Sequence, residues 1–287
     1  MRIGVLLRQV PDPEARLEVD AATARVAEGS SPWVIDESDE AALDAGLELA
    51  ATSGGEVVAI ALGPARADQA ARKALALGAR RAIRVETDDP ASPDVRVTGA
   101  VVAAAARRAS IDLLLAGAQS SAAGTGLVAS ASALALGWPW IWLVLEAELE
   151  EVGPAEGARP MLRVVQELEA RRRRRWRVRP PAVLAIQTGR YHARMPAIRG
   201  VLAARRAPIE TLEARELGAR PEASTPGLRR VALDPPAAAT GVEWIAGGAG
   251  GDGGGGDGRD WGGREQDGAE GVAARRLIRR LREVGVL

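Results

Sequence analysis

The stretch VVAIALGPARADQAARKALALGARRAIRVE, residues 57–86, decides the fold of this 287-residue chain. It opens within the apolar run Glu56–Leu62, whose length and continuity are typical of a strand buried on both faces of a sheet. A Gly-Pro pair turns the chain, and the alanine-rich segment 65–77 predicts a helix that ends at Gly78. The alternating segment Arg81–Glu86 predicts the next strand. A strand, a helix and a strand with short connections form a right-handed crossover, so this stretch predicts a parallel sheet.

The same alternation extends outward over residues 1–137. It predicts strands at 3–7, 56–62, 81–86 and 111–115, and helices at 40–51, 65–77, 95–108 and 125–136. Asp36 or Ser38 stands where the first helix needs its N-cap. We therefore predict an α/β fold with a Rossmann-like, doubly wound, mostly parallel sheet. Ligands of such sheets bind beyond the carboxyl ends of the strands.

The pattern changes after residue 137. Segments 140–148, 161–167 and 176–179 predict a small antiparallel extension, and 183–187 predicts another buried strand. The glycine-rich segment 247–263 predicts a flexible linker, and 268–284 has the spacing of an amphipathic helix that packs either on a partner or back on its own domain. We predict a nucleotide-binding α/β domain over 1–212 and a C-terminal arm over 213–287.

Composition excludes several classes of function. The 38 basic and 38 acidic residues balance, which argues against a nucleic-acid partner. The arginine run 171–175 before Trp176 is then best interpreted as a solvated hairpin. There is no cysteine and a single histidine, His192, so thiolate chemistry is excluded and a histidine-based metal site or triad is disfavoured. No apolar run approaches about 18 residues, so we expect no membrane insertion and a cytoplasmic location. Paired carboxylates such as Asp36/Asp39 and Glu148/Glu150 are interpreted as surface acids.

The loop AGAQSSAAGTGLVAS, residues 116–130, follows the fourth predicted strand. Its GTGLVA segment fits the alanine-ending variant of a dinucleotide fingerprint, but it does not follow the first strand. The favoured interpretation is a loop leading into a helix N-terminus. Backbone N–H groups of Gly126, Leu127 and Val128, with the helix dipole, would hold a phosphate without any cationic side chain. A plain turn between strand and helix remains the alternative.

Taken in order, these segments resemble the β subunit of electron-transfer flavoprotein, including its nitrogen-fixation-linked versions. Five segments match family patterns. IGVLLRQVPDPEA (3–15) corresponds to VKxVPDP, and DESDEAALDAGLEL (36–49) corresponds to NPxDxxAxExAxxL. Residues 57–86 correspond to VxxxSxGPxxAxxxLRxALAMGADRAxxV, DLLLAGAQSSAAGTGLVASASALALGWP (112–139) to DLVxxGxQSxDxxTGQxxxxLAxxLGWP, and ARMPAIRGVLAARRAPIETL (193–212) to PRYPSLPGIMxAxKKPI. The closing LIRRLREVGVL resembles the family's last helix. The similarity spans nearly the whole chain except the glycine-rich segment.

The resemblance implies an adenine nucleotide alpha-hydrolase-like fold and a heterodimer with an α subunit. It implies a redox-active FAD lying mostly on the α subunit near the interface. The β subunit would hold AMP, or a second FAD in electron-bifurcating members, and would perform no bond chemistry itself. The dimer would take electrons from acyl-CoA or other dehydrogenases and pass them to the electron-transfer flavoprotein quinone oxidoreductase.

By position, the resemblance also implies two sets of site residues. The nucleotide set is Leu6, Asp36, Glu37, Ser38, Leu62, Gly117, Gln119, Ser121, Gly124, Thr125, Gly126, Leu127 and Val128. The dehydrogenase-docking set lies in the loop 194–203 and comprises Arg194, Ile198, Arg199 and Gly200, with Ile198 as the apolar anchor. Arg194 could alternatively lie near the flavin or the subunit interface. An aliphatic tip ringed by arginines suits an acidic partner.

The chain departs from the family pattern in the nucleotide loop. The family's Asn-Pro is Asp36-Glu37, and its loop acids are replaced by Ala122, Ala123 and Gly124. These changes leave open whether the site takes AMP, takes FAD or is empty. Two alternatives remain: an adenine-nucleotide-binding regulatory or stress domain on the same fold, which is usually about half this length, and a divergent paralogue that has lost its nucleotide.

Overall fold

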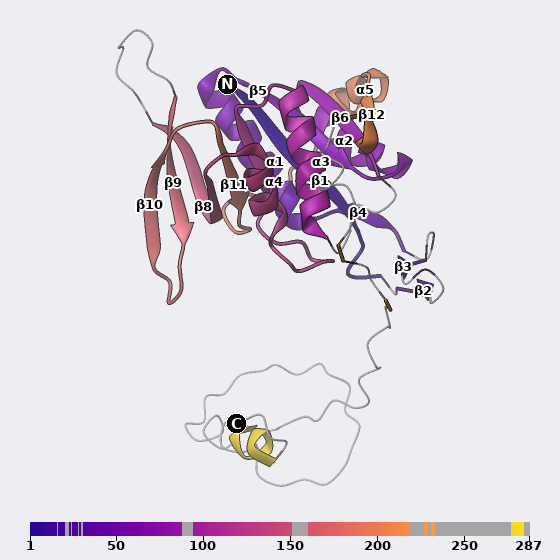
Figure 1. The fold of residues 1–287 in the computed structure, drawn as a ribbon, viewed down its shortest axis with the longest axis vertical. Coiled ribbons are helices and arrows are strands. Elements are labelled where there is room, and N and C mark those ends of the chain that lie inside the picture. The colour runs from indigo at the N-terminus through magenta and orange to yellow at the C-terminus, as the bar shows by residue number, and fades with distance from the viewer. Residues whose placement is uncertain are drawn as a thin grey trace, which may run out of the picture. The chain divides into compact units, whose positions relative to one another are not determined.

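The structure, a computed structural model, describes residues 1–15, 17–20, 23, 25–27, 29, 31–87, 94–150, 160–217, 227–228, 231–232 and 277–283. The chain divides into two compact units, Met1–Pro235 and Pro236–Leu287 (Figure 1). In the second unit, residues 277–283 are helical. The predicted linker 247–263 and the rest of the predicted helix 268–284 lie outside the described residues.

The first unit is built on one large sheet. Among the described residues, its ten strands follow the order β10-β9-β8-β11-β7-β1-β5-β6-β12, with β4 paired to β1. The parallel strands are β1 (Arg2–Pro11), β5 (Glu56–Leu62), β6 (Arg81–Glu86), β7 (Leu113–Gly117), β11 (Ala182–Ile186), β12 (Glu210–Glu213) and, beside β11, β8 (Trp140–Glu150). The antiparallel strands β9 (Met161–Glu167) and β10 (Arg173–Val178) extend it past β8. The mostly parallel sheet with a small antiparallel extension is confirmed.

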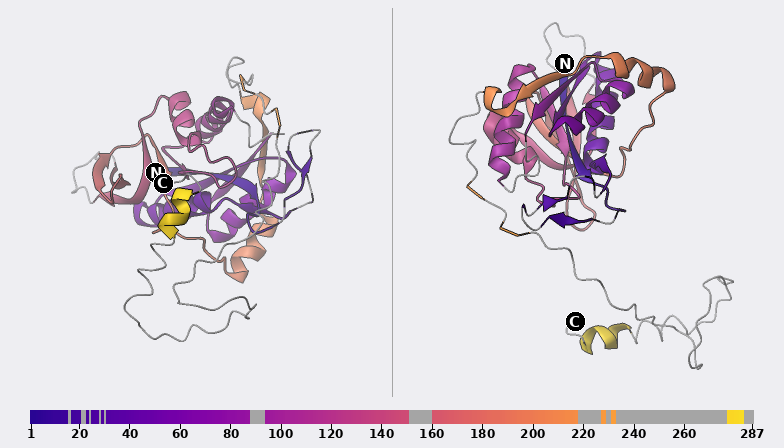
Figure 2. Two further views of the ribbon diagram at one scale, coloured as in Figure 1. Left: turned by 90° about the horizontal axis from the view of Figure 1, so that it is seen from below. Right: turned by 90° about the vertical axis from the view of Figure 1, so that its right-hand side faces the viewer.

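Helices cover both faces of this sheet, as Figure 2 shows. The helices α1 (Glu37–Ser53) and α2 (Asp68–Leu77), with the short helix η1 (Ala65–Ala67) before α2, pack on one apolar cluster. The helices α3 (Val95–Arg108) and α4 (Val128–Leu136) pack on the other. Alanines from all four helices are buried in these clusters, because small side chains allow close approach to the strands. The doubly wound arrangement is therefore confirmed.

The strand order reverses direction at β1. The chain runs from β1 outward through β5 to β6, and then returns to the other side of β1 to form β7 and β11. Connections therefore leave the carboxyl ends of β1 and β7 toward opposite faces of the sheet. In open α/β sheets this is where ligands bind.

Several elements differ from the predictions. Helix α4 begins at Val128 and not at residue 125, because Gly124 and Gly126 both have φ of 63°, which is incompatible with a helix. Strand β10 begins three residues earlier than predicted. The predicted docking loop 194–203 is helical from its fifth residue, since α5 spans Ile198–Arg206. Strands β2 (Val19–Asp20), β3 (Arg25–Val26), β4 (Trp33–Ile35) and β12 and the short helix η2 (Ala214–Leu217) were not predicted. In the described part of the chain, no helix has both the length and the apolar character that crossing a bilayer requires.

Candidate functional site

The carboxylate of Asp36 lies between the carboxyl ends of β1 and β7. It caps α1 by accepting hydrogen bonds at Oδ1 from the backbone N–H and hydroxyl of Ser38, at 3.1 and 2.5 Å. At Oδ2 it accepts from the hydroxyl of Ser120 (2.9 Å) and from the N–H and hydroxyl of Ser121 (2.8 and 3.0 Å). Five donors saturate the lone pairs of this carboxylate. Asp36 therefore fastens the loop after β7 to the start of α1.

These donors set the protonation state of Asp36. Burial of the side chain, which is 1% exposed, would by itself raise the pKa of the carboxyl group. The hydrogen bonds from Ser38 and from the N–H of Ser121, the nearby charge of Arg8 and the hydroxyl of Ser120 together lower that pKa below its usual range. Asp36 is accordingly an anion at neutral pH.

A second carboxylate, Asp39, lies one helical turn further along α1. Its Oδ2 accepts the backbone N–H and Nε of Arg8 at 2.8 and 2.9 Å, and its Oδ1 accepts Nη2 of Arg8 at 2.8 Å and the N–H of Gly117 at 2.9 Å. Burial would lower the pKa of Arg8, but the adjacent Asp39 carboxylate more than offsets this and raises it. The interpretation of Asp36 and Asp39 as surface acids is wrong, because Asp39 is fully buried as well. Both groups join α1 to β1 and β7.

Gly117 is required by this packing. A Cβ atom at this position would lie 2.6 Å from the Cβ of Ser38, so the end of β7 can approach α1 this closely only with glycine. Its N–H is already bound by Asp39 and is not available to a ligand. The structure thus gives Gly117 a role in forming the site.

The loop 118–127 folds back on itself beyond these anchors. Gln119 donates from Nε2 to the carbonyl of Gly124 at 2.7 Å, and the N–H of Gly124 donates to the carbonyl of Ser120 at 2.9 Å. The indole of Trp142, on β8, donates from Nε1 to the carbonyl of Ala118 at 3.3 Å. A Cβ atom on Gly126 would lie 3.6 Å from the same indole. Trp142 therefore holds the loop against β8.

The end of this loop offers unused donors. Among the described residues, no hydrogen-bond partner is found for the backbone N–H groups of Thr125, Gly126, Leu127 and Val128. Leu127 occupies the N-cap position of α4 without a side-chain cap, and the first turn of α4 contains no acid. Orphan N–H groups and the positive end of the helix dipole suit an anion. The residues present fit a phosphate group.

The remaining predicted nucleotide contacts differ in accessibility. Leu6 and Leu62 are buried in the apolar cluster beneath α3 and α4, so their side chains are unavailable to a ligand. Glu37 and Ser121 are exposed. Apart from these two leucines, the predicted residues gather around the start of α1 and the loop after β7.

The predicted docking residues form a separate surface. Ile198 begins α5 and is 80% exposed, and Met195, three residues before it in the chain, is 93% exposed. Arg194 is not a free cation, because its guanidinium pairs with Asp44 and Glu48 of α1.

Helix α5 is held tightly against α2. A side chain at Gly200 would collide with the carbonyl of Ala76, so this glycine allows the close approach of the two helices. Arg72 of α2 donates from Nη1 to the carbonyl of Ala204 at 2.8 Å. Of the predicted set, Arg194, Ile198 and Arg199 are exposed and Gly200 is partly buried, but only Arg194 is held by ion pairs to α1.

Four residues of the site were not in the predicted set: Arg8, Asp39, Ser120 and Trp142. Arg8 and Asp39 stand at the Lys of VKxVPDP and the Asp of NPxDxxA, so the motifs contained a signal for them. Ser120 lies between two predicted residues. Trp142 could not be predicted from the sequence, because its contact with the loop depends on where β8 lies in the sheet.

In the described part of the chain, no group of three or more His, Asp or Glu side chains is arranged to hold a metal ion.

A family model described as "Electron transfer flavoprotein domain" matches residues 23–217. The chain belongs to the electron transfer flavoprotein family. The electron transfer flavoprotein subunit beta of Methylophilus methylotrophus is 30% identical over 224 residues, covering 76% of this chain and 81% of that protein. The subunit beta of Bacillus subtilis (strain 168) is 26% identical over 232 residues, covering 80% and 86%. Protein FixA of Rhizobium meliloti (strain 1021) is 37% identical over 105 residues, covering 37% and 36%.

Within the electron transfer flavoprotein family, the similarity is to the β subunits and FixA proteins. The predicted resemblance is thereby confirmed, and the α/β fold agrees with it. Family membership supports a role in electron transfer as a β-type chain.

Proposed function

We propose that this chain is the β subunit of a heterodimeric electron transfer flavoprotein. With an α subunit that carries most of the redox-active FAD, it would take electrons from acyl-CoA or other dehydrogenases and pass them to a quinone oxidoreductase. The flavin supplies the electron-carrying chemistry when bound. This chain's own residues hold a nucleotide and present docking surfaces, and it catalyses no bond-making step itself.

The observation that carries the nucleotide part is the set of N–H groups at Thr125–Val128, which have no hydrogen-bond partner in the part of the chain that the structure describes. They lie at the N-terminus of α4, in the connection that follows β7, beside the point where the strand order reverses. Asp36 and Asp39 fasten the preceding segment, so the donors are preorganised. We propose that they bind the phosphate of AMP, or a phosphate of a second FAD.

Side chains of the loop leave the choice between these nucleotides open to experiment. Ala122 and Ala123 are exposed and offer no acceptor to a ribose or a magnesium ion. The phosphate donors are main-chain groups and are retained whatever these side chains are. A paralogue without nucleotide is the alternative that this loop would also permit.

The test is to co-express the chain with an α-type flavoprotein subunit and purify the complex. The absorbance spectrum gives flavin content, and chromatography of the nucleotides released on denaturation gives the second ligand. A yellow heterodimer with one FAD and one AMP supports the proposal, and two FAD per dimer would indicate the bifurcating form. A colourless monomer that binds ATP would contradict it in favour of a regulatory or stress domain. A yellow dimer without AMP or a second FAD would indicate that the site has lost its nucleotide.

A further inference from the structure

A buried carboxylate on α1 holds the chain just before the exposed residues of the predicted docking set. Asp44, which is 7% exposed, accepts the backbone N–H of His192 at Oδ2, at 3.0 Å, and pairs through Oδ1 with the guanidinium of Arg194. Glu48, one turn further along α1, accepts Nη2 of Arg194 at 3.4 Å. These contacts fasten the segment that follows β11 to α1.

The exposed residues that come next cannot fix their own position. We call residues 195–199 the docking tip, which includes the exposed Met195 and Ile198. Residues 195–197 are Met, Pro and Ala, whose side chains carry no charge and no hydrogen-bond donor. Helix α5 has nine residues and starts at Ile198 without a side-chain cap. Because so short and uncapped a helix is marginal by itself, the position of the tip depends on its flanks.

The docking tip is fastened on both sides. On its C-terminal side, α5 lies against α2, where Gly200 permits the close approach and Arg72 binds the carbonyl of Ala204. On its N-terminal side, the fastening is the pair of contacts that Asp44 makes. The tip is therefore a short bridge between α1 and α2, and Asp44 holds the end of it that belongs to no helix.

We propose that Asp44 is the residue that positions the docking tip for the dehydrogenase. A docked protein would contact the exposed Met195 and Ile198 and not the buried carboxylate, so Asp44 acts through the segment that it holds. A binding segment that is ordered in advance loses less conformational entropy on association, and its affinity is higher for that reason. The inference rests on the proposed function, in which the tip docks a dehydrogenase.

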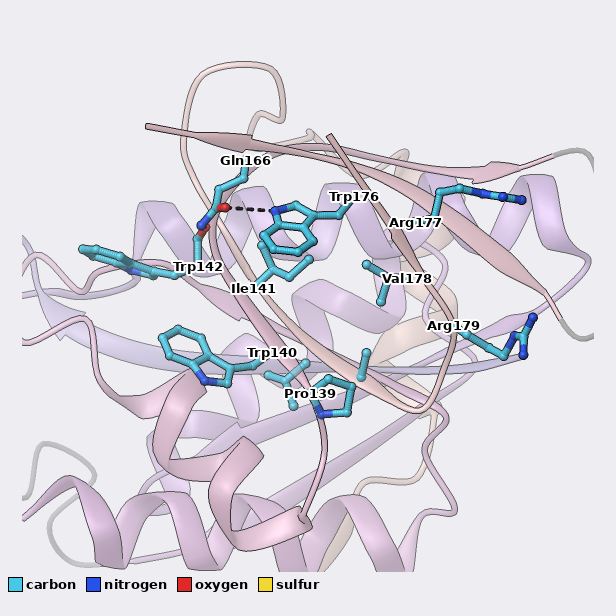
Figure 3. A pocket seen from close by; sticks show the side chains of 11 residues that line it. Pro139, Trp140, Ile141, Trp142, Gln166, Trp176, Arg177, Val178 and Arg179 are labelled. Atoms are coloured by element: carbon cyan, nitrogen blue, oxygen red, sulfur yellow. Dashed lines mark hydrogen bonds between the residues drawn. The ribbon is translucent and has the colours of Figure 1, made fainter. Parts of the chain in front are cut away.

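The docking tip is separate from a tryptophan-lined pocket of this chain. That pocket, of about 430 Å³, lies at the β10 end of the sheet and is lined in part by Trp140, Trp142 and Trp176 (Figure 3). Helix α5 packs on α2, and α2 lies on β5 and β6, toward the other end (Figure 1). A substitution of Asp44 should therefore leave the pocket unaltered, and a change in docking would arise at the tip.

The test uses the purified complex of the chain with an α-type subunit and varies the concentration of an acyl-CoA dehydrogenase. Asp44→Ala should lower kcat/KM for the dehydrogenase about three- to tenfold, because docking must then order the tip, and should leave kcat and flavin content unchanged. Asp44→Asn keeps an acceptor for the N–H of His192 but loses the ion pair, so its effect should be smaller. Tyr191, which is buried and bonded to Ala147 of β8, should keep both variants folded.

Glu40→Gln is the matched control. Glu40 lies one turn before Asp44 on α1 and pairs with Lys73 of α2, so this variant removes one negative charge from the same helix without touching the tip. It should behave as wild type. Trypsin cleavage after the exposed Arg199, followed by mass spectrometry, reports the order of the tip without any dehydrogenase. Cleavage should be faster in Asp44→Ala than in wild type or Glu40→Gln.

The outcomes separate the inference from the function on which it rests. An unchanged kcat/KM in Asp44→Ala would overturn the inference, whether or not cleavage is faster. So would an equal fall in kcat and kcat/KM, which would place the effect on electron transfer and not on docking. If Arg194→Met lowered kcat/KM and Asp44→Ala did not, Arg194 itself would contact the dehydrogenase. If the wild-type complex accepted no electrons from the dehydrogenase, the proposed function would fail, and the cleavage rates alone would decide whether Asp44 orders the tip.

Discussion

The Oδ2 atom of Asp36 accepts hydrogen bonds from both the backbone N–H and the hydroxyl of Ser121, although the two residues are 85 positions apart. This pair joins the N-cap of α1 to the loop that carries the candidate phosphate donors. A buried anion held only by neutral donors is sensitive both to protonation and to replacement by an amide.

Asp36 should make folding stability depend on acid pH. Its folded pKa lies below the ordinary value of 3.8, so the unfolded chain binds the proton more readily. The contribution is complete above the unfolded pKa and is lost as pH falls through the lower folded pKa. Asp36→Asn should remove this slope and destabilise the chain at pH 7 by roughly 1–3 kcal/mol, because its amide NH2 would face donors. Urea denaturation between pH 3 and 7 measures the acid dependence of stability and the loss of stability at pH 7. Glu37→Gln, at the exposed neighbour, should change neither quantity. If Asp36→Asn kept the acid dependence of wild type, Asp36 would not be its source.

Asp39→Asn should be more damaging than Asp36→Asn. It leaves the buried guanidinium of Arg8 without its counter-charge, and breaking such a pair costs about 3–5 kcal/mol. The midpoint of urea denaturation should fall accordingly. Arg8→Met with Asp39→Leu removes both charges, but it also removes the acceptor of the Gly117 N–H, so we expect only partial recovery. If Asp39→Asn denatured at the same urea concentration as wild type, the ion pair would not contribute to stability.

Gly126→Glu should empty the nucleotide site of the purified heterodimer. It places a carboxylate beside the phosphate donors and forces a side chain into a left-handed backbone conformation. Gly126→Ala separates the two effects, because it adds the strain without the charge. Gly137→Glu is the matched control at the other end of α4, where φ is 74° and a Cβ would meet nothing within 4 Å. Released nucleotide is quantified by chromatography. Full occupancy in Gly126→Glu would rule out these donors as the phosphate site.

Ile198→Asp should weaken docking of the dehydrogenase without changing flavin content. An exposed apolar anchor at the start of α5 becomes a charge that an apolar pocket would reject. The rate of electron transfer should fall at low dehydrogenase concentration and recover in part as that concentration rises. Leu134→Asp, equally exposed on α4, should leave the rate unchanged. If both variants transfer electrons as wild type does, the anchor lies elsewhere.

The core of the fold follows from local sequence. Strands β5 and β6 and helix α3 have the predicted bounds, because continuous apolar runs and small-residue helices admit few other structures. Helix α5 was missed because Gly200 and four arginines within 194–206 hide its apolar residues. Strand β12 is polar and lies at the sheet edge, so its sequence, ETLE, has no buried pattern.

The site was predictable only in part. The loop and its donors could be recognised from glycine spacing next to a helix. The first residue of α4 could not be predicted from the sequence, because glycine is compatible with both a helix and a left-handed turn until the tertiary structure selects one. The burial of Asp36 and Asp39 depends on which residues of the loop after β7 reach them, and that distance is set by the whole sheet.

The donors of Thr125–Val128 belong to the main chain, and a main-chain N–H is the same whichever residue carries it. Side-chain substitutions in this loop can therefore change the surroundings of the phosphate without removing the hydrogen bonds that hold it, provided that Gly124 and Gly126 remain. Lineages could exchange the rest of the ligand, one nucleotide for another, by changing a few exposed side chains such as Ala122 and Ala123. The main chain of the loop would thus keep the phosphate site constant while its side chains determine which nucleotide is bound.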